Sequence, residues 1–535
     1  MRLRTCILIL LSIGTGLCAG KKDQVPRFQT SDRCVACHNE LKTASGQDVS
    51  IGFDWRSSMM ANSSRDPYWQ ASVRRETIDQ PGLTAHIEDE CSICHMPITR
   101  YDAKLQRRNG KVFAHLPFEN DKKQGTEAAD GVSCSVCHQI SAEKLGTRES
   151  FNGGFVLAPA DSQDLRPEYG PFEIDRGQVR IMRTSTGGFQ PVKSSDHLQK
   201  SELCATCHTL ITTAFGRDGK EVGSLPEQMP YQEWLHSDFK TKQTCQDCHM
   251  PEVPEPAPIT RVFGVPREHM KRHVFVAANF FMQRMLNQYR ADLETEALPQ
   301  ELSAAADYTV AYLKEKAARV RIENVQLNAG RMEAEVVVEN LGGHKLPTAY
   351  PSRRCWLHIT VHDRNGRVVF ESGAMRPDGS IAGNDNDADP RRYEPHYSQI
   401  TSSEQVQIYE DIMGDPGGQV TTGLLTAVRY LKDNRLLPRG FDKRSADKEI
   451  AVVGEALEDP SFIGGTHRVR YAISLSGAEG PLRMDAELWY QPIGYRWANN
   501  LKPYNKAPEP LRFNTFFDAM AKSSGEILSR ASITR

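Results

Sequence analysis

The sequence lacks both a net charge of either sign and a long apolar run. Its 66 lysines and arginines nearly balance 68 aspartates and glutamates, which gives a formal net charge of −2. A balance of this kind indicates no nucleic acid or other polyanion as a partner. Beyond residue 20, no stretch approaches the roughly 20 apolar residues that a transmembrane helix needs. We therefore expect no nucleic-acid partner and no transmembrane segment in the mature chain.

Cysteine is scarce outside one short motif. Of thirteen cysteines, Cys6 and Cys18 lie within the first 20 residues, ten belong to the motif, and only Cys355 is left over. A single remaining thiol cannot form a disulfide framework within the chain. This excludes the class of small exported folds that disulfides hold together.

The motif is Cys-x-x-Cys-His, and it occurs five times between residues 34 and 249. Its copies are Cys34, Cys37 and His38; Cys91, Cys94 and His95; Cys134, Cys137 and His138; Cys204, Cys207 and His208; and Cys245, Cys248 and His249. Two thiols that attach a porphyrin and a histidine that binds its iron form the attachment site of a c-type haem. A zinc site or a disulfide loop is the alternative, but neither requires a histidine after every second cysteine. The motif predicts five covalently bound haem c (heme c) groups.

The N-terminus has the pattern of a secretory signal peptide over residues 1–20. A basic start at 1–4 precedes a short apolar run at 5–16, and small residues follow around Cys18. We expect export to the periplasm or the extracellular space, where haem attachment would consume ten otherwise hazardous thiols. Lipid attachment at Cys18 is the alternative, although the bulky Leu17 before it fits the lipidation pattern poorly.

The five motifs occupy less than half of the chain and define a first domain over residues 21–260. They are irregularly spaced and separated by Gly- and Pro-rich stretches, so we expect a mainly irregular and helical domain. A Pro-rich connector at 250–258 leads into a short helical segment at 261–318. Within this segment, apolar periodicity predicts helices at 274–292 and 298–318.

Residues 319–535 change from a helical to an alternating apolar pattern, which is typical of strands. The strands are expected at 320–325, 332–338, 356–361, 368–370, 406–409, 466–475 and 484–490. Asn365-Gly366 between two of them is a hairpin signal. We predict a C-terminal β-sandwich-like domain with long loops and no haem motif, and hence an α+β multidomain fold.

The sixth ligand of each iron decides what a haem protein of this kind does. A second histidine or a methionine makes an electron carrier, whereas an open position allows substrate chemistry. The candidate distal ligands near a motif or in a flexible loop are His115, His197, His236, His273 and His344. His86 and His269 are weaker candidates, because a solvated helix face explains either of them well. Met59 or Met60 is an alternative ligand.

His344 differs from the other candidates because it lies in the predicted β-domain, in the sequence NLGGHKLPT at 340–348. The two glycines before it and the proline after it let the backbone approach another domain closely. A loop histidine with a local hydrogen bond is the alternative interpretation. As a ligand, His344 would make the β-domain dock on the haem domain as part of the electron path.

The motif surroundings resemble multihaem c-type cytochromes of the cytochrome c-554 type. The resemblance covers roughly residues 30–290. It rests on two Cys-His-Met-Pro sequences, on 204–210, on Glu-Trp-Leu-His at 233–236 and on Arg-His-Val-Phe at 272–275. It implies stacked haem pairs, mostly with two histidine ligands each, in a mainly helical or irregular exported domain. The Gly-His-Lys-Leu-Pro-Thr loop looks like the β-domain attached to some of these cytochromes. Ammonia-forming nitrite reductases carry one Cys-x-x-Cys-Lys site, and this chain has none.

An electron carrier is the leading interpretation: a pentahaem cytochrome that passes electrons between redox partner proteins, either other cytochromes or a membrane quinol oxidoreductase. One alternative is an oxidoreductase with one five-coordinate haem that acts on a small nitrogen or sulfur compound. The haem at His38 is the best candidate for that role, because no histidine lies between His38 and His86. Another alternative is a structural subunit of a larger cytochrome assembly, and the oligomeric state stays open.

Overall fold

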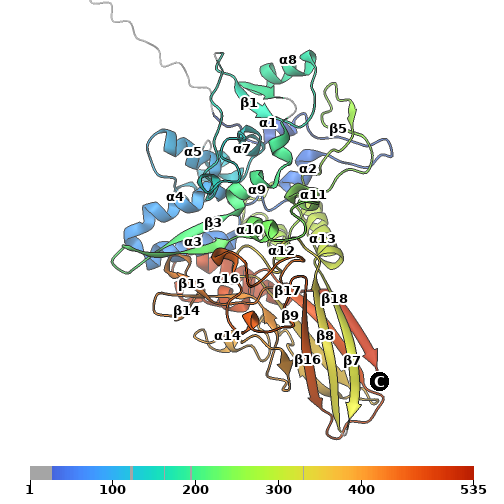
Figure 1. Ribbon diagram of the computed structural model, residues 1–535. Coiled ribbons are helices and arrows are strands. Elements are labelled where there is room, and N and C mark those ends of the chain that lie inside the picture. Colours follow the sequence, from blue (N-terminus) through green and yellow to red (C-terminus); the bar gives the residue numbers. More distant parts are fainter. Residues whose placement is uncertain (1–26, 121–123, 162, 193–194, 329) are drawn as a thin grey trace, which may run out of the picture.

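The computed structural model describes residues 27–535, except 121–123, 162, 193–194 and 329. The predicted signal peptide and Cys18 lie outside the described residues. Figure 1 shows helices and irregular loops at one end of the molecule, in blue to green, and long strands at the other, in yellow to red. This mixture of helices and open sheets agrees with the expected α+β class. Among the described helices, none combines the length and the apolar composition needed to cross a membrane.

The part of the chain that carries the motifs consists of short helices joined by irregular segments. Its helices are α1 (Asp32–Val35), α2 (Ile51–Arg56), α3 (Pro67–Asp79), α4 (Thr84–His95), α5 (Pro97–Leu105), α6 (Gln124–Ala129), α7 (Cys134–Gln139), α8 (Arg176–Ser185), α9 (Ser201–His208), α10 (Pro230–Leu235) and α11 (Cys245–His249). Each motif overlaps one of α1, α4, α7, α9 and α11. Because residues i, i+3 and i+4 share one face of a helix, the two cysteines and the histidine of a motif point the same way.

Three two-stranded sheets lie among these helices. They are β1 (Arg166–Tyr169) with β2 (Phe189–Val192), β3 (Leu210–Phe215) with β4 (Glu221–Gln228), and β5 (Ala257–Pro258) with β6 (Pro266–Arg267). The β3–β4 hairpin was not expected, because Gly223 and Pro226 interrupt β4 and strand patterns avoid both residue types. The hairpin forms around the turn at Gly219, whose φ is +73°.

Two helices connect the motif-bearing part to the long strands: α12 (Phe280–Gln288) and α13 (Pro299–Lys316). The second agrees closely with the prediction at 298–318. The first was predicted at 274–292 and begins only at Phe280, which corrects its start. Val276 explains the difference, because its backbone bonds His249 rather than its own helix. Its N–H donates to the carbonyl of His249 (3.0 Å), and its carbonyl accepts from His249 Nδ1 (2.5 Å). Phe275 also has a φ of +44°, which a right-handed helix does not allow.

The C-terminal part contains two larger sheets and one smaller one. The first has the order β10 (Val368–Ser372), β9 (Arg354–His362), β17 (Arg483–Gln491), β18 (Glu526–Thr534), with β12 (Ile408–Tyr409) also paired to β9. The second has the order β11 (Gln399–Ile400), β16 (Thr466–Ser474), β8 (Arg331–Asn340), β7 (Ala318–Asn328). The smaller sheet joins β14 (Val420–Thr421), β13 (Asp411–Gly414) and β15 (Arg429–Asp433). Helices α14 (Asp385–Ala388), α15 (Tyr495–Asn499) and α16 (Pro508–Met520) complete this part.

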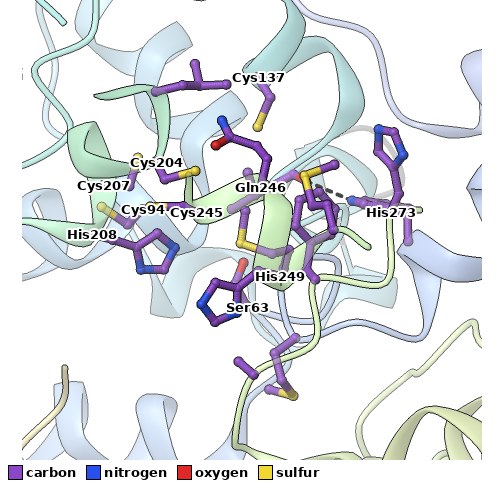
Figure 2. A pocket seen from close by; sticks show the side chains of 18 of the residues that line it. Ser63, Cys94, Cys137, Cys204, Cys207, His208, Cys245, Gln246, His249 and His273 are labelled. Atoms are coloured by element: carbon purple, nitrogen blue, oxygen red, sulfur yellow. Dashed lines mark hydrogen bonds between the residues drawn. The ribbon is translucent and has the colours of Figure 1, made fainter. Parts of the chain in front are cut away.

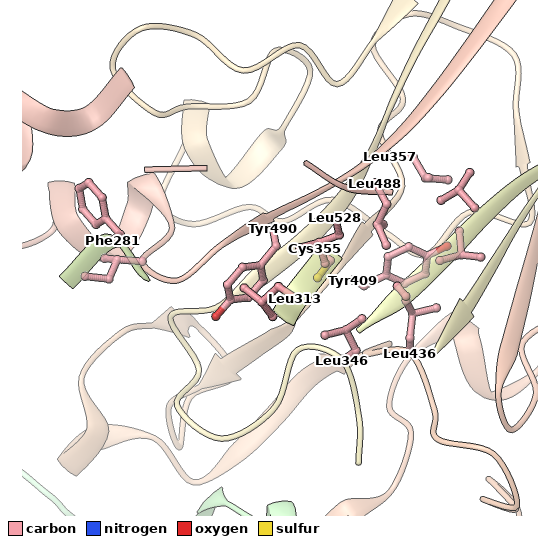
Figure 3. Packing of buried hydrophobic residues seen from close by; sticks show 14 of the residues in the cluster. Phe281, Leu313, Leu346, Cys355, Leu357, Tyr409, Leu436, Leu488, Tyr490 and Leu528 are labelled. Carbon is pink, nitrogen blue, oxygen red and sulfur yellow. The ribbon is translucent and has the colours of Figure 1, made fainter. Parts of the chain in front are cut away.

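The two larger sheets contribute to one apolar core. Leu357 of β9 and Leu488 of β17 lie on one side of it, and Val336 of β8 and Tyr471 of β16 belong to the same buried cluster. Figure 3 shows this packing around Tyr409, Cys355 and Leu488. Burial alternates along most of β17 and along the second half of β9, as the period of two in the sequence predicts, whereas residues 354–357 of β9 are all buried. The smaller sheet, α16 and β18 were not predicted.

Candidate cofactor site

All five motifs line one cavity of about 1810 Å³. The cavity is larger than the roughly 300–1,000 Å³ of a pocket for one small ligand. Its wall also includes residues of the β8–β9 loop, such as His344 and Tyr350, so both parts of the chain build it. In Figure 2, side chains from several motif helices, among them Cys94, Cys207 and His208, gather around this space. A single cavity therefore has room for several large cofactors beside one another.

Four of the five motif histidines are oriented by hydrogen bonds from Nδ1 to backbone carbonyls. The pairs are His38 with Ile259 (2.5 Å), His95 with Ser63 (2.8 Å), His138 with Tyr169 (2.7 Å) and His249 with Val276 (2.5 Å). A carbonyl oxygen only accepts, so Nδ1 carries the proton and Nε2 keeps its lone pair for a metal. Burial lowers the pKa of His95 and of His249 to about 4, which keeps both rings neutral at neutral pH. This donor set fits a haem iron.

The motifs lie in contact with one another. Side-chain hydrogen bonds join the thiols of Cys34 and Cys134, of Cys94 and Cys207, and of Cys204 and Cys245. Serines hold two of these helix pairs in place: Ser31 Oγ accepts from the backbone of Cys134 (3.2 Å), and Ser201 Oγ accepts from that of Cys245 (3.1 Å). Groups attached at touching thiols are therefore close neighbours.

Two motif histidines face a second imidazole across the cavity. The ring centroids of His249 and His344 are 6.2 Å apart with 12° between the planes, and those of His138 and His273 are 6.4 Å apart with 16° between the planes. Two imidazoles that bind one metal ion from opposite sides, each with a metal–nitrogen bond of about 2 Å, place their centroids about 6 Å apart. The spacing of both pairs fits an iron between them.

A buried hydrogen-bond network holds the loop of His344 against α10. Glu233 of α10 is fully buried, and its Oε2 accepts from the backbone N–H of Lys345 (3.1 Å) and from Thr348 Oγ1 (2.6 Å). Its Oε1 lies 3.2 Å from Arg435 Nη1. Arg435 and Lys345 in turn share the buried carboxylate of Asp433, at 2.7 Å each. The residues that follow His344 are thus fixed to the motif-bearing part.

The other predicted distal ligands do not line the cavity. His115 is buried in a short turn, and His197 uses Nε2 to bond the carbonyl of Ile140 (2.8 Å). His236 lies between the two parts of the chain, with Nε2 3.6 Å from Asp447. Conversely, the weaker candidates His86 and His269 do line the cavity.

Those two weaker candidates have different surroundings. His86 meets Phe215 edge to face, with centroids 5.4 Å apart. His269 is largely exposed, and its Nδ1 lies 2.8 Å from Glu252. Met59 and Met60 also line the cavity. Among the described residues, no imidazole faces His38, His95 or His208 as His344 faces His249.

Several polar residues of the cavity wall were not found from the sequence. Tyr68 and Glu76 come from α3, Glu227 from β4, and Tyr350 and Arg353 from the β8–β9 loop. The hydroxyls of Tyr68 and Tyr350 share a hydrogen bond, and their rings meet edge to face. These residues lie far apart along the chain and belong to no motif, so only the folded arrangement brings them together.

The chain is similar in fold to a solved structure, a penta-heme cytochrome c552 from Thermochromatium tepidum. The similarity covers 95% of this chain and 99% of that chain, with a TM-score of 0.52 and 16% sequence identity. At this level of identity the similarity shows the fold alone. No family model and no curated protein matches the sequence.

Proposed function

We propose that the protein is an exported pentahaem c-type cytochrome that transfers electrons between redox partner proteins. The observation that supports this most directly is the pair of facing imidazoles, His249 with His344 and His138 with His273, inside a cavity lined by five haem motifs. Two histidine ligands occupy both axial positions of a haem iron. Such a six-coordinate iron carries electrons without binding substrate.

The chain's residues have three roles in this proposal. The ten motif cysteines are tethers, the five motif histidines are proximal ligands, and His273 and His344 are distal ligands. When bound, the haems supply one-electron redox chemistry. At four of the five motif histidines, a backbone carbonyl that accepts from Nδ1 fixes the ring and raises the basicity of Nε2, which is the usual contribution of residues behind a metal ligand.

Contacts between motifs bring the proposed haems together in two groups, and Cys137 of the third motif, which acts electrostatically on Cys204 and Cys207, lies near the second group. The thiols of the first motif touch the third at Cys34 and Cys134, and the fourth motif touches the second at Cys207 and the fifth at Cys204. Tethers that touch keep their cofactors adjacent, so electrons need no moving part of the protein. The partners in this proposal are other cytochromes or a membrane quinol oxidoreductase, as the sequence led us to expect.

Counting haems and their spin states tests the proposal. Mass spectrometry of the purified protein should give five attached haems, and electron paramagnetic resonance of the ferric protein should give low-spin signals for the haems at His138 and His249. A protein without covalent haem, or one in which every iron is high-spin, contradicts the assignment. The two measurements need no substrate or partner.

Catalysis at one haem is a second candidate function, favoured by the hydroxyls of Tyr68 and Tyr350 and by Arg353, which lies close to His208. Such groups donate protons and hydrogen bonds to a ligand on an iron. Carbon monoxide binding to the reduced protein would identify an open iron. Turnover of a small nitrogen or sulfur compound would then establish the activity, and a protein that binds no carbon monoxide rules it out.

A further inference from the structure

Two buried carboxyl groups line the cavity beside the second motif. Glu76 of α3 and Glu227 of β4 have exposed fractions of only 5% and 3%. Both act electrostatically on the thiol of Cys91, and Glu76 acts on Glu227 as well. Neither residue belongs to a haem motif or to the set of axial ligands, so the proposed electron path does not account for them.

Neither carboxyl forms an ion pair with a lysine or an arginine of the described chain. Glu227 accepts hydrogen bonds from Thr212 Oγ1 (2.5 Å) and Gln228 Nε2 (3.3 Å). Glu76 Oε1 accepts from the backbone N–H of Leu424 (2.9 Å), and the backbone N–H of Leu425 also bonds this carboxylate. Burying a carboxylate without a cation is costly, and two such groups near each other cannot both ionise readily.

The charged and titratable groups around the pair come from four elements. Arg75 and Asp79 lie on α3 beside Glu76, Cys91 lies on α4, Tyr350 on the β8–β9 loop and Tyr430 on β15. Of these, only Arg75 is a cation, and it favours the ionised form of Glu76. Burial raises the pKa of Glu227 to about 7 and also raises that of Glu76. Glu227 therefore exchanges a proton near neutral pH, and the neighbouring Glu76 shares its preference for the protonated form.

We propose that Glu76 and Glu227 form a proton-binding site that takes up one proton when the haem at Cys91 and His95 is reduced. This inference rests on the proposed function, because it requires a haem at that motif. One electron from the redox partner reduces ferric to ferrous iron, and one proton from solvent forms an O–H bond on a carboxylate of the pair. Oxidation returns both. No other bond forms or breaks.

Electrostatics gives the direction of this coupling. Reduction removes one positive charge near the carboxylates, and that charge had favoured their ionised form, so their affinity for a proton rises. The coupling is reciprocal, so a bound proton makes reduction more favourable. For a fully coupled one-electron, one-proton site, a tenfold change in proton concentration corresponds to a shift of about 59 mV in the reduction potential.

The test compares Glu227→Gln and Glu76→Gln with the holoprotein, and Glu221→Gln serves as the control because Glu221 lies at the exposed end of the same strand. Redox titrations between about pH 6 and pH 8 span the titration of Glu227, whose pKa is about 7. Other carboxyls with raised pKa values, such as that of the half-buried Glu168, line the same cavity, so the readout is the difference between variant and wild type. We expect both cavity variants to take up fewer protons per full reduction, and the control to match the wild type.

Infrared difference spectra of the reduced and oxidised protein supply a second readout. Wild type should gain a protonated-carboxyl band on reduction, and Glu227→Gln should lose that band. The inference is overturned if both cavity variants hold five haems yet keep the wild-type proton uptake and the wild-type band. A wild-type protein without haem at Cys91 would instead overturn the proposed function itself, and mass spectrometry of the peptide containing Cys91 and Cys94 distinguishes the two outcomes.

Discussion

The imidazoles of His249 and His344 face each other across 6.2 Å, although one ends a motif helix and the other lies in a loop of the strand-rich part. The facing geometry depends on that part of the chain being docked, because Glu233 of α10 binds both Lys345 and Thr348 beside His344. The β-strand region is therefore more than an appendage of the motif-bearing region, because it contributes to the cavity wall and to the proposed ligand set.

Replacing His344 with alanine should leave one haem iron without its distal ligand. We expect the His344→Ala protein to keep five covalent haems, since the thiols of Cys245 and Cys248 are unchanged, and to change one of its five irons from low spin to high spin. Low-temperature electron paramagnetic resonance measures this change. His362→Ala is the matched control, because His362 lies on β9 and does not line the cavity. A spectrum of His344→Ala identical to that of the wild type would contradict the assignment of His344.

Two histidines lie near His138, and they should respond differently to substitution. His273 faces the ring of His138, whereas Nε2 of His197 is bonded to the carbonyl of Ile140. We expect His273→Ala to produce a new high-spin signal and carbon monoxide binding, and His197→Ala to keep the low-spin spectrum. The reverse result would exchange the roles of the two residues. Ultraviolet–visible spectra with and without carbon monoxide check both variants.

The buried carboxylate of Glu233 should be important for stability. Glu233→Ala leaves the buried Arg435 without this partner and two donors without their acceptor, so we expect the free energy of unfolding to fall by about 3–5 kcal/mol. Glu233→Gln keeps an acceptor oxygen for Lys345 N–H and should lose less. Chemical denaturation followed by circular dichroism measures both. An alanine variant as stable as the glutamine variant would show that the hydrogen bonds contribute nothing.

The sequence predicted those features that depend on neighbouring residues. The i, i+3, i+4 spacing of each motif is enough to place its cysteines and histidine on one helix face, and alternation was enough to locate β8, β9, β16 and β17. The start of α12 was predicted wrongly, because the apolar pattern around Val276 does not reveal that its backbone is bonded to His249.

Features that depend on long-range contacts were beyond the sequence. His273 and His344 were candidates among several histidines, and only the fold brings each of them opposite a motif histidine. Glu76 and Glu227 gave no signal at all, because a lone glutamate on a helix or strand is usually solvated. Their burial depends on contacts between segments far apart in the sequence, such as that of Glu76 with the backbone of Leu424.

Acid should weaken the network behind His344. Burial alone would raise the pKa of Asp433, but the charges of Arg435 and Lys345 outweigh it and hold that pKa below its ordinary value. A carboxyl with a lowered pKa contributes stability above its unfolded pKa of about 4, and this contribution is lost as the pH falls further. We expect Asp433→Asn to show a smaller loss of stability than the wild type below about pH 4. Burial raises the pKa of Asp411 to about 7 instead. Asp411 is therefore already protonated below about pH 4 and does not add to the loss of stability in that range.

The two kinds of cysteine in the chain should behave differently when replaced. Cys355 of β9 is fully buried in the apolar core, far from any haem motif in the sequence, so Cys355→Ala should keep five haems and lose about 1 kcal/mol of stability. Cys207→Ser removes a tether whose thiol touches Cys94, so we expect one covalent haem fewer, or a single-thioether attachment, and disturbed spectra of the neighbouring haem. Intact-protein mass spectrometry with in-gel haem staining measures both variants. Haem loss from Cys355→Ala, or five normal haems in Cys207→Ser, would contradict the division of the cysteines into tethers and one core residue.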